Sequence, residues 1–446
     1  MRKNVLTALV CVFLMTVPAL ASVQNVKVGG DIKTSSYIYN GFDLGTGTNA
    51  TNNHAQNVVL SQLNLNVDAD LTDKVSTNIG LKNERLWGTN DTASESNTLS
   101  VESAYVKMKE MFFEPLTLIV GRQPLIYGNK MIIAKSGTNR IAALKGVTGD
   151  VNFDAIKAIL KYDPLTVDLF ASRVTENKLV SDGPDTNVNL YGINANYKFD
   201  DKMKTVVEAY TFVKTTGAGG NAQSGNTKND VIYVPGLRIS ANPTNALNVQ
   251  LEGAYQAGTL GNNTSLNTKN RLSAYAFQGV VNYNLPVLKK ISPVVSAGMS
   301  YFSGDNEPQA TDAKSKDWQL IYGNLFNGTI FKTLFTPQKN LAIAQLGIEV
   351  KPLKDLKANL TWYNVNLAQR VSTMALNRSD YMTAGPTFDV NGKKSLGNEI
   401  DLDLTYAYTQ DVKFKTTAGY FAPGKGLSPV AQDSAIELVS SVCVTF

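Results

Sequence analysis

Cysteine and histidine are almost absent from this sequence of 446 residues. It contains two cysteines, Cys11 and Cys443, and one histidine, His54. These counts exclude a zinc site built from cysteine and histidine, which takes about four such ligands. A catalytic site with a histidine base would depend on His54, which lies in a polar segment outside every predicted strand. We therefore expect no metal, no other cofactor and no enzymatic activity.

Long apolar stretches are missing after residue 21. Before that point, Arg2 and Lys3 precede an apolar run at 5–17, and small residues follow it at 18–21. This pattern predicts a secretory signal peptide at 1–21, which leaves a mature chain of 22–446. Because no later stretch reaches the length that a transmembrane helix needs, a helical membrane protein is excluded. Cys443 then has no disulfide partner within the mature chain.

Charged residues are sparse and nearly balanced. They make up 18% of the sequence, and the net charge of +5 falls to +3 once Arg2 and Lys3 are removed. So weak an imbalance indicates no particular partner. No nucleic-acid motif is present either, and we expect no nucleic-acid partner.

Apolar and polar residues alternate with a period of two along much of the sequence, which is typical of strands with one apolar and one polar face. The alternation is clearest in 61–69 and 247–256, where apolar residues face one side and polar residues the other. The segments that we predict as strands number eighteen: 26–40, 57–70, 75–88, 98–109, 115–123, 153–162, 165–175, 188–199, 203–214, 230–241, 246–258, 271–284, 291–302, 339–350, 356–369, 397–409, 412–422 and 434–446.

The connections between these segments alternate in length. Short connections such as 71–74, 163–164 and 410–411 take turns with long ones such as 124–152 and 303–338. Bacterial outer-membrane barrels have short periplasmic turns and longer extracellular loops, whereas a soluble sandwich has no reason to sort its loops in this way. We therefore predict an all-β fold, a transmembrane antiparallel up-and-down β-barrel of about eighteen strands in the outer membrane of a Gram-negative bacterium.

The final segment, 435–446, alternates up to its last residue, Phe446. An apolar outer face that ends on an aromatic residue fits a closing strand whose ring lies in the interfacial girdle. The pattern also resembles the assembly signal of outer-membrane barrels, so we expect the barrel-assembly machinery to recognise Phe446. Cys443 falls on the lumen-facing set. We expect lipid and lipopolysaccharide around the barrel, and a girdle that includes the tryptophans Trp87, Trp318 and Trp362.

Strand parity places charges of both signs on the face that would line an aqueous lumen. The acidic residues of one strand are Glu399, Asp401 and Asp403, and the next strand carries Lys413 and Lys415. Facing rows of opposite charge would bias which ions pass. A cross-strand ladder of ion pairs that fixes the register is the alternative. Basic candidates on other strands are Lys157, Lys161 and Arg238.

Arg122 interrupts the pattern of its strand. Alternation from Leu118 and Val120 points Arg122 toward lipid. Either Arg122 lies above the apolar band, or a bulge at Gly121 turns it into the lumen. We predict the bulge, which would make Arg122 a selectivity residue.

The loop 124–152 contains Lys130 followed by the apolar residues Met131, Ile132 and Ile133. Such a run is unfavourable on a solvated loop. We predict that this part of the loop folds into the barrel and narrows it. Packing on neighbouring loops outside the barrel is the alternative.

Two stretches resemble the alginate-export family of outer-membrane barrels. The first is 103–133, with Gly121-Arg122-Gln123 and Tyr127-Gly128-Asn129, and it continues to 153–173. The second is 395–424, with Glu399-Ile400-Asp401-Leu402 and Gly419-Tyr420-Phe421. The resemblance implies an eighteen-stranded export channel or porin, which agrees with the number of predicted strands.

The sequence departs from that family in its arginines. Where the family often has arginine after a Phe-Asp pair, this chain has Lys157, and eight arginines follow residue 21. A lumen for an anionic polysaccharide would use many arginines, because each binds a carboxylate in two places.

We expect an outer-membrane porin that moves small hydrophilic solutes or oligosaccharides, by passive diffusion or export. A barrel of this size leaves an aqueous lumen. One alternative is a surface adhesin or structural barrel that works through its long loops. A second alternative is an outer-membrane hydrolase, which would need His54 beside a nucleophile.

Overall fold

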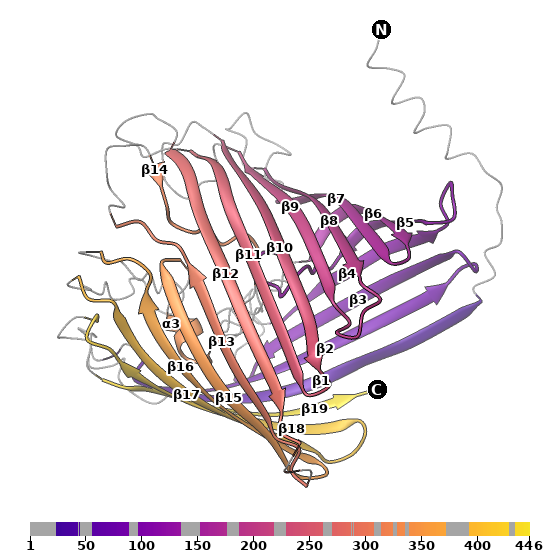
Figure 1. Cartoon of the computed structure of the whole chain (residues 1–446). Helices are drawn as coiled ribbons and strands as arrows, with labels where there is room; N and C mark the ends of the chain where they lie inside the picture. The colour runs from indigo at the N-terminus through magenta and orange to yellow at the C-terminus, as the bar shows by residue number, and fades with distance from the viewer. Residues whose placement is uncertain are drawn as a thin grey trace.

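The computed structural model shows one antiparallel sheet closed into a barrel (Figure 1). The residues it describes are 24–42, 44, 56–88, 97–134, 152–175, 187–217, 229–261, 270–286, 288, 290–306, 314–323, 328–334, 339–371, 392–427 and 433–446. The predicted signal peptide, 1–21, and His54 lie outside these residues.

Eighteen long strands form the wall. The first nine are β1 (Asn25–Asn40), β2 (Gln56–Asp70), β3 (Val75–Leu86), β4 (Asn97–Lys109), β5 (Leu116–Gln123), β6 (Phe153–Tyr162), β7 (Leu165–Thr175), β8 (Val188–Lys198) and β9 (Val206–Thr216). The others are β10 (Asp230–Thr244), β11 (Leu247–Leu260), β12 (Asn270–Asn284), β13 (Val294–Phe302), β15 (Leu341–Leu353), β16 (Leu356–Leu367), β17 (Ser395–Ala407), β18 (Val412–Pro423) and β19 (Ala435–Thr445). Two short elements lie between β13 and β15: β14 (Lys314–Ser315) and helix α3 (Phe331–Leu334).

Neighbouring wall strands pair antiparallel in chain order, and β1 closes the barrel by pairing with both β2 and β19. The two-residue β14 pairs parallel with the start of β12 and is not part of this cycle. The predicted fold, an antiparallel barrel of eighteen strands, is therefore confirmed. The predicted starts and ends differ from the observed ones by a few residues. At β9 the observed strand starts three residues later than predicted, where the turn continues to Thr205 and Lys204 adopts a positive φ of 50°.

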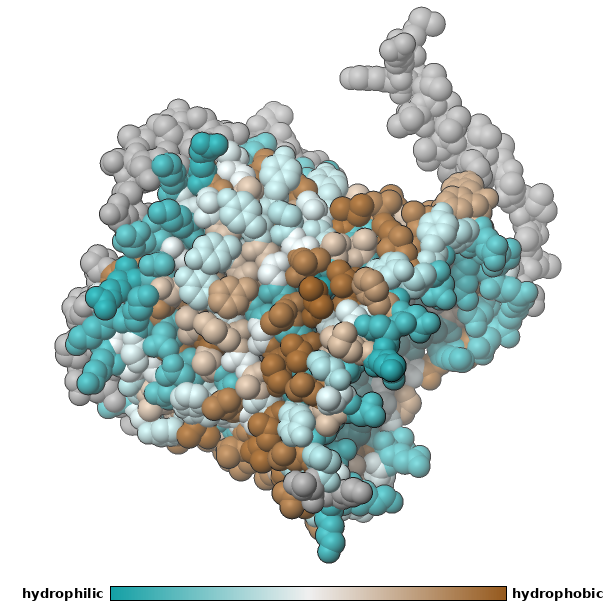
Figure 2. Space-filling view, in the orientation of Figure 1, coloured by the Kyte–Doolittle hydropathy of each residue, from teal (hydrophilic) through white to brown (hydrophobic). Residues whose placement is uncertain are grey.

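Alternation along each strand separates an apolar outer face from a mixed inner face. Ile156, Tyr191 and Leu251 are among the exposed outer residues, with exposed fractions of 56%, 44% and 56%. Figure 2 shows hydrophobic residues in a band across the outer face of the wall in this view. An apolar band around a polar interior is the pattern of a barrel that spans the outer membrane.

The seam between the first and last strands is closed by main-chain hydrogen bonds at Phe446. Its N–H donates to the Gly30 carbonyl at 3.0 Å, and the Gly30 N–H donates to the Phe446 carbonyl at 2.8 Å. The Phe446 ring lies over Gly30, and 56% of the residue is exposed on the outer face. Cys443 lies on the opposite, inner face, as the alternation of β19 requires.

The loop-side half of the interior is packed with apolar side chains. Trp318 is 1% exposed and lies beside Phe302, with ring centroids 6.2 Å apart. The prediction that Trp318 belongs to the outer girdle was wrong, because this residue lies on an inward-folded connection rather than on a strand. Trp87 and Trp362 are exposed.

Candidate functional site

The inner face of β6 to β11 carries charged side chains in pairs. Lys157 Nζ lies 3.2 Å from Asp168 Oδ2 on the next strand, and Arg238 Nη1 lies 3.6 Å from Glu208 Oε2. Glu252, on β11, is 2% exposed and accepts a hydrogen bond from the Tyr210 hydroxyl at 2.7 Å. These contacts form a cross-strand ladder of polar pairs.

The segment 124–134, which follows β5, crosses this ladder inside the barrel. The Gly128 N–H donates to Glu208 Oε1 at 2.9 Å, and the Asn129 N–H donates to Glu252 Oε2 at 2.6 Å. Arg238 Nε donates to Asn129 Oδ1 at 2.5 Å. Hydrogen bonds to charged groups contribute about 1.5–3 kcal/mol each, so these contacts hold the segment firmly against β9 and β11. We call 124–134 the first inward segment.

Gly128 is required at the tip of this segment for two reasons. Its φ is +58°, a region that side chains with a Cβ rarely adopt. A Cβ at this position would also lie 2.5 Å from Glu252 Oε1. The close approach of the main chain to a carboxylate thus depends on glycine.

The apolar run after the tip is buried. Met131, Ile132 and Ile133 are each 2% exposed or less, whereas Lys130 is exposed at the tip. Ile133 forms a β-bridge with Tyr322, and the Tyr322 N–H donates to the Ile132 carbonyl at 3.0 Å. The run therefore packs against a second connection inside the barrel and not on loops outside it.

That second connection includes a second inward segment, 328–334, which contains α3. Glu399, on β17, is 0% exposed and accepts hydrogen bonds from three consecutive main-chain N–H groups. The Ile330 N–H and Phe331 N–H bonds measure 2.8 and 2.6 Å, and Thr329 is the third donor. One wall carboxylate thus fixes the start of α3, and the sequence contained no periodic signal for this contact.

The predicted facing rows of opposite charge are not formed by Glu399 and Asp401. Both face the interior, but both are buried, with exposed fractions of 0% and 4%. The register also staggers the lysines, since Lys413 lies opposite Ala407 and Lys415 opposite Thr405. Glu399 anchors a segment instead, because the second inward segment covers it.

Four other predicted residues lie near the periplasmic ends of their strands. Asp403 pairs with Lys415, whose Nζ is 3.2 Å from Asp403 Oδ1. Lys413 and Lys161 are exposed, and both belong to the inward-facing sets of their strands. These residues surround the periplasmic opening rather than the level of the inward segments.

The prediction that a bulge at Gly121 turns Arg122 into the lumen was wrong. The pairing of β5 with β4 and β6 continues through Gly121 without a shift, so Arg122 keeps the outward direction of Val120. Gly121 has a φ of +124°, and a Cβ there would collide with the Ala104 carbonyl. The glycine permits close approach of β4 but does not reverse the face.

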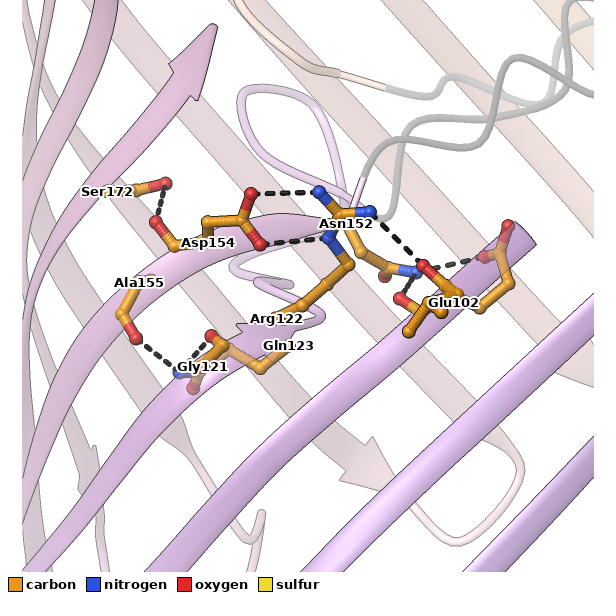
Figure 3. Close-up of polar contacts among 9 residues, drawn as sticks. Glu102, Gly121, Arg122, Gln123, Asn152, Asp154, Ala155 and Ser172 are labelled. Carbon is orange, nitrogen blue, oxygen red and sulfur yellow. Dashed lines mark hydrogen bonds and ion pairs between the residues drawn. The ribbon is translucent and has the colours of Figure 1, made fainter. Parts of the chain in front are cut away.

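On the outer face, Arg122 pairs with Asp154 across two neighbouring strands (Figure 3). Nε and Nη2 each donate to one Asp154 oxygen at 2.8 Å, and Nη1 donates to the Val101 carbonyl at 3.2 Å. Gln123 points inward and donates to the Gly121 and Ala155 carbonyls. Arg122 is therefore not a lumen residue.

In the described part of the chain, no three histidine, cysteine, aspartate or glutamate side chains are arranged to hold a metal ion. No helix among the described residues is long and apolar enough to cross a membrane.

A closed barrel of eighteen strands with an apolar outside and polar inner walls defines an outer-membrane channel. The family model for alginate export matches residues 24–439, and the chain belongs to this family. No curated protein matches the sequence. The predicted family, the channel function and the outer-membrane location are thereby confirmed, and the outer wall contacts membrane lipid.

Solved outer-membrane channels share the fold at low sequence identity. OccK8 (OprE) of Pseudomonas aeruginosa gives a TM-score of 0.57 at 14% identity, covering 95% of this chain and 98% of that one. OpdK of the same organism, solved with vanillate, gives 0.56 at 10% identity, covering 94% and 99%. OccAB3 of Acinetobacter baumannii gives 0.53 at 10% identity, again covering 94% and 99%.

Proposed function

We propose that this channel admits small hydrophilic solutes by passive diffusion past the first inward segment. The hydrogen bonds from Gly128 and Asn129 to Glu208 and Glu252 carry this proposal. They hold the segment inside the barrel and bring the exposed side chain of Lys130 to its tip. A fixed segment across an aqueous lumen limits the size of the solutes that pass.

The charges around the segment support weak rather than strong ion selectivity. Lys157 and Arg238 are each balanced by a neighbouring carboxylate, Asp168 and Glu208. Balanced pairs leave little net field for a passing ion. We therefore propose neutral sugars and small carboxylates as solutes, in preference to polyanionic polysaccharides.

Liposome swelling with a series of solutes tests this proposal. The series comprises neutral mono- and disaccharides, uronic acids, amino acids and vanillate, the last because OpdK was solved with it. We expect the swelling rate to fall with solute size and to differ little between a neutral sugar and its uronic acid. Swelling that is restricted to long oligosaccharides would contradict the proposal.

Single-channel conductance distinguishes the channel hypothesis from the adhesin hypothesis. Most of the long loops on which an adhesin would depend lie outside the described residues. A purified, folded barrel should give single-channel steps in a planar bilayer. A folded barrel without conductance would favour the adhesin. The hydrolase reading requires hydrolytic activity that is lost on replacing His54.

We also propose that Phe446 is the signal read by the barrel-assembly machinery. Its exposed ring lies at the seam of the barrel, and its main chain pairs with Gly30. Replacing Phe446 with serine should lower the amount of assembled barrel in the outer membrane, whereas replacing Tyr408 with serine should not. Equal amounts of assembled barrel for Phe446→Ser and the wild type would refute this role.

A further inference from the structure

Residues 318–323 belong to the connection between β13 and β15, and they contact both the wall and the first inward segment. We call 318–323 the bridging segment. The Tyr322 N–H donates to the Ile132 carbonyl at 3.0 Å, and the Ala134 N–H donates to the Tyr322 carbonyl at 2.9 Å. Bonds on both sides of one residue form a short parallel ladder, which joins the bridging segment to residues 131–134. We call 131–134 the return arm of the first inward segment.

The first inward segment is therefore held at two places. Its tip donates to Glu208 and Glu252 on the wall. Its return arm is held by the bridging segment, which comes so close that a Cβ at Gly323 would collide with the Met131 carbonyl. An anchor at the tip alone would leave the arm free to rotate about that point. The position of the arm thus depends on what holds the bridging segment.

Gln256, on the inner face of β11, holds the bridging segment with two hydrogen bonds. Its Nε2 donates to the Gln319 carbonyl at 2.7 Å, and the Gln319 N–H donates to Gln256 Oε1 at 2.8 Å. One side-chain amide thus serves both main-chain polar groups of a single residue, as a neighbouring strand would do. Main-chain groups that are removed from water need such partners. The Gln256 side chain is itself 0% exposed, so it has no alternative bonds to water.

The other contacts of the bridging segment are mostly made by rings. The Tyr322 ring lies between Lys214 Nζ, 5.1 Å from its centroid, and Phe153, whose ring centroid is 5.2 Å away. Trp318 packs on Phe302, and its N–H donates to the Ser303 carbonyl at 3.0 Å at the start of the segment. Apolar contacts are non-directional and permit sliding, whereas hydrogen bonds have a narrow range of distance and angle. The amide pair at Gln319 therefore defines where the middle of the segment lies on the wall.

We propose that Gln256 is a positioning residue that sets the largest solute the channel admits. It fixes the bridging segment on the wall, the bridging segment fixes the return arm, and the arm limits the opening beside the first inward segment. The inference rests on the proposed function, in which solutes diffuse past that segment. Gln256 acts through other residues and does not itself contact the solute, because it is buried.

Replacing Gln256 with alanine tests the proposal by two measurements on the full-length barrel. We expect the protection of the Tyr322 and Ala134 amides against hydrogen exchange to fall about tenfold, because two hydrogen bonds of ordinary net strength are lost. In liposome swelling, the rate for a neutral trisaccharide should rise relative to the rate for a monosaccharide. Gln278→Ala is the matched control, since Gln278 lies on the inner face of β12 and donates to Ser300 on the neighbouring wall strand at 3.3 Å.

A cross-link between the return arm and the bridging segment provides a rescue. Ile133 and Tyr322 are paired in a β-bridge, and neighbouring strands lie about 4.8 Å apart, within the range of about 4.4–6.8 Å that a disulfide spans between Cα atoms. Ile133→Cys and Tyr322→Cys are combined in a Cys443→Ser background, with Gln256 either intact or replaced by alanine. The reduced protein should admit the trisaccharide, and oxidation of the same protein should restore the lower size limit in both versions.

Three results would overturn the proposal. The first is unchanged exchange and an unchanged swelling ratio in Gln256→Ala. The second is an equal change in Gln278→Ala, which would indicate general loosening of the wall. The third is a swelling ratio that oxidation of the cysteine pair leaves unaltered. A wild-type barrel that passes no monosaccharide would refute the proposed function instead, and amide exchange in the return arm would still decide whether Gln256 positions it.

Discussion

The main-chain N–H of Asn129 donates to Glu252 Oε2 across 2.6 Å, which ties the connection after β5 to the inner face of β11. The carboxylate is also held by Tyr210, so its position does not depend on the segment alone. A buried acid on one side of the wall thus fixes a segment that begins on another side. We propose that contacts of this kind set the effective opening of the channel.

Replacing Gly128 with valine should displace the first inward segment and raise single-channel conductance. The variant combines an unfavourable positive φ, which costs about 1–3 kcal/mol, with a contact 2.5 Å from Glu252 Oε1. Gly88→Val is the matched control, because Gly88 also has a positive φ, +79°, but has no atom within 4 Å of an added Cβ. Conductance that is raised equally in both variants would contradict the role of the Glu252 contact.

Replacing Glu399 with glutamine should loosen the second inward segment. The Glu399 carboxylate accepts hydrogen bonds from three main-chain donors, whereas a glutamine side chain offers one uncharged acceptor oxygen. Each charge-assisted hydrogen bond that is lost destabilises the segment by about 1.5–3 kcal/mol. Faster hydrogen exchange at residues 329–331, measured by mass spectrometry in micelles, would show this. Glu349→Gln, on the same inner wall but paired with Lys357 at 2.8 Å, should leave exchange there unchanged.

Replacing Lys157 and Arg238 together with glutamine should shift the reversal potential toward cations. Each substitution leaves a carboxylate, Asp168 or Glu208, without its partner near the first inward segment. Lys161→Gln at the periplasmic opening should shift the potential less. Measurements across a salt gradient in planar bilayers distinguish these cases. No shift in the double variant would show that these residues do not border the ion path.

Cys443 should react with a small charged thiol reagent in the folded barrel. Its side chain belongs to the inner face of β19 and is partly exposed near the periplasmic end. In a Cys443→Ser background, Val442→Cys would point toward lipid and should stay unreactive in membranes. The mass increase after labelling reports both results. Reaction of Val442→Cys in place of Cys443 would reverse the assigned faces.

Acidification should loosen the turn between β8 and β9 at Asp201. The Thr205 hydroxyl and N–H, at 2.6 and 2.8 Å, hold the pKa of Asp201 below its ordinary value of 3.8. Because the folded pKa is lowered, the stabilisation is complete at neutral pH and is lost as pH falls below 3.8 through the folded value. The protection of the Thr205 amide against exchange, relative to the intrinsic rate at each pH, should fall over that range, and Asp201→Asn should show the lower protection already at neutral pH.

The alternation of residues determined the wall. A period of two is a local property, so it assigned Phe446 and Val442 to one face and Cys443 to the other before any contact was known. The alternation of short and long connections also indicated an even number of strands. The alternation also pointed Arg122 outward. The prediction for this residue was wrong because it preferred a bulge at Gly121 over simple alternation.

Only the tertiary structure decided what the inner residues do. Glu399 and Glu252 follow the strand pattern that any lumen carboxylate would follow, yet both are buried under inward segments. The main-chain hydrogen bonds to Glu399 come from residues 68–70 positions away in the sequence. The main-chain hydrogen bond to Glu252 comes from a residue 123 positions away. No periodicity along one strand contains such a relationship. The sequence by itself therefore determined which face each side chain takes, and the closing of the barrel decided which carboxylates became anchors, because closure brings distant strands and connections together.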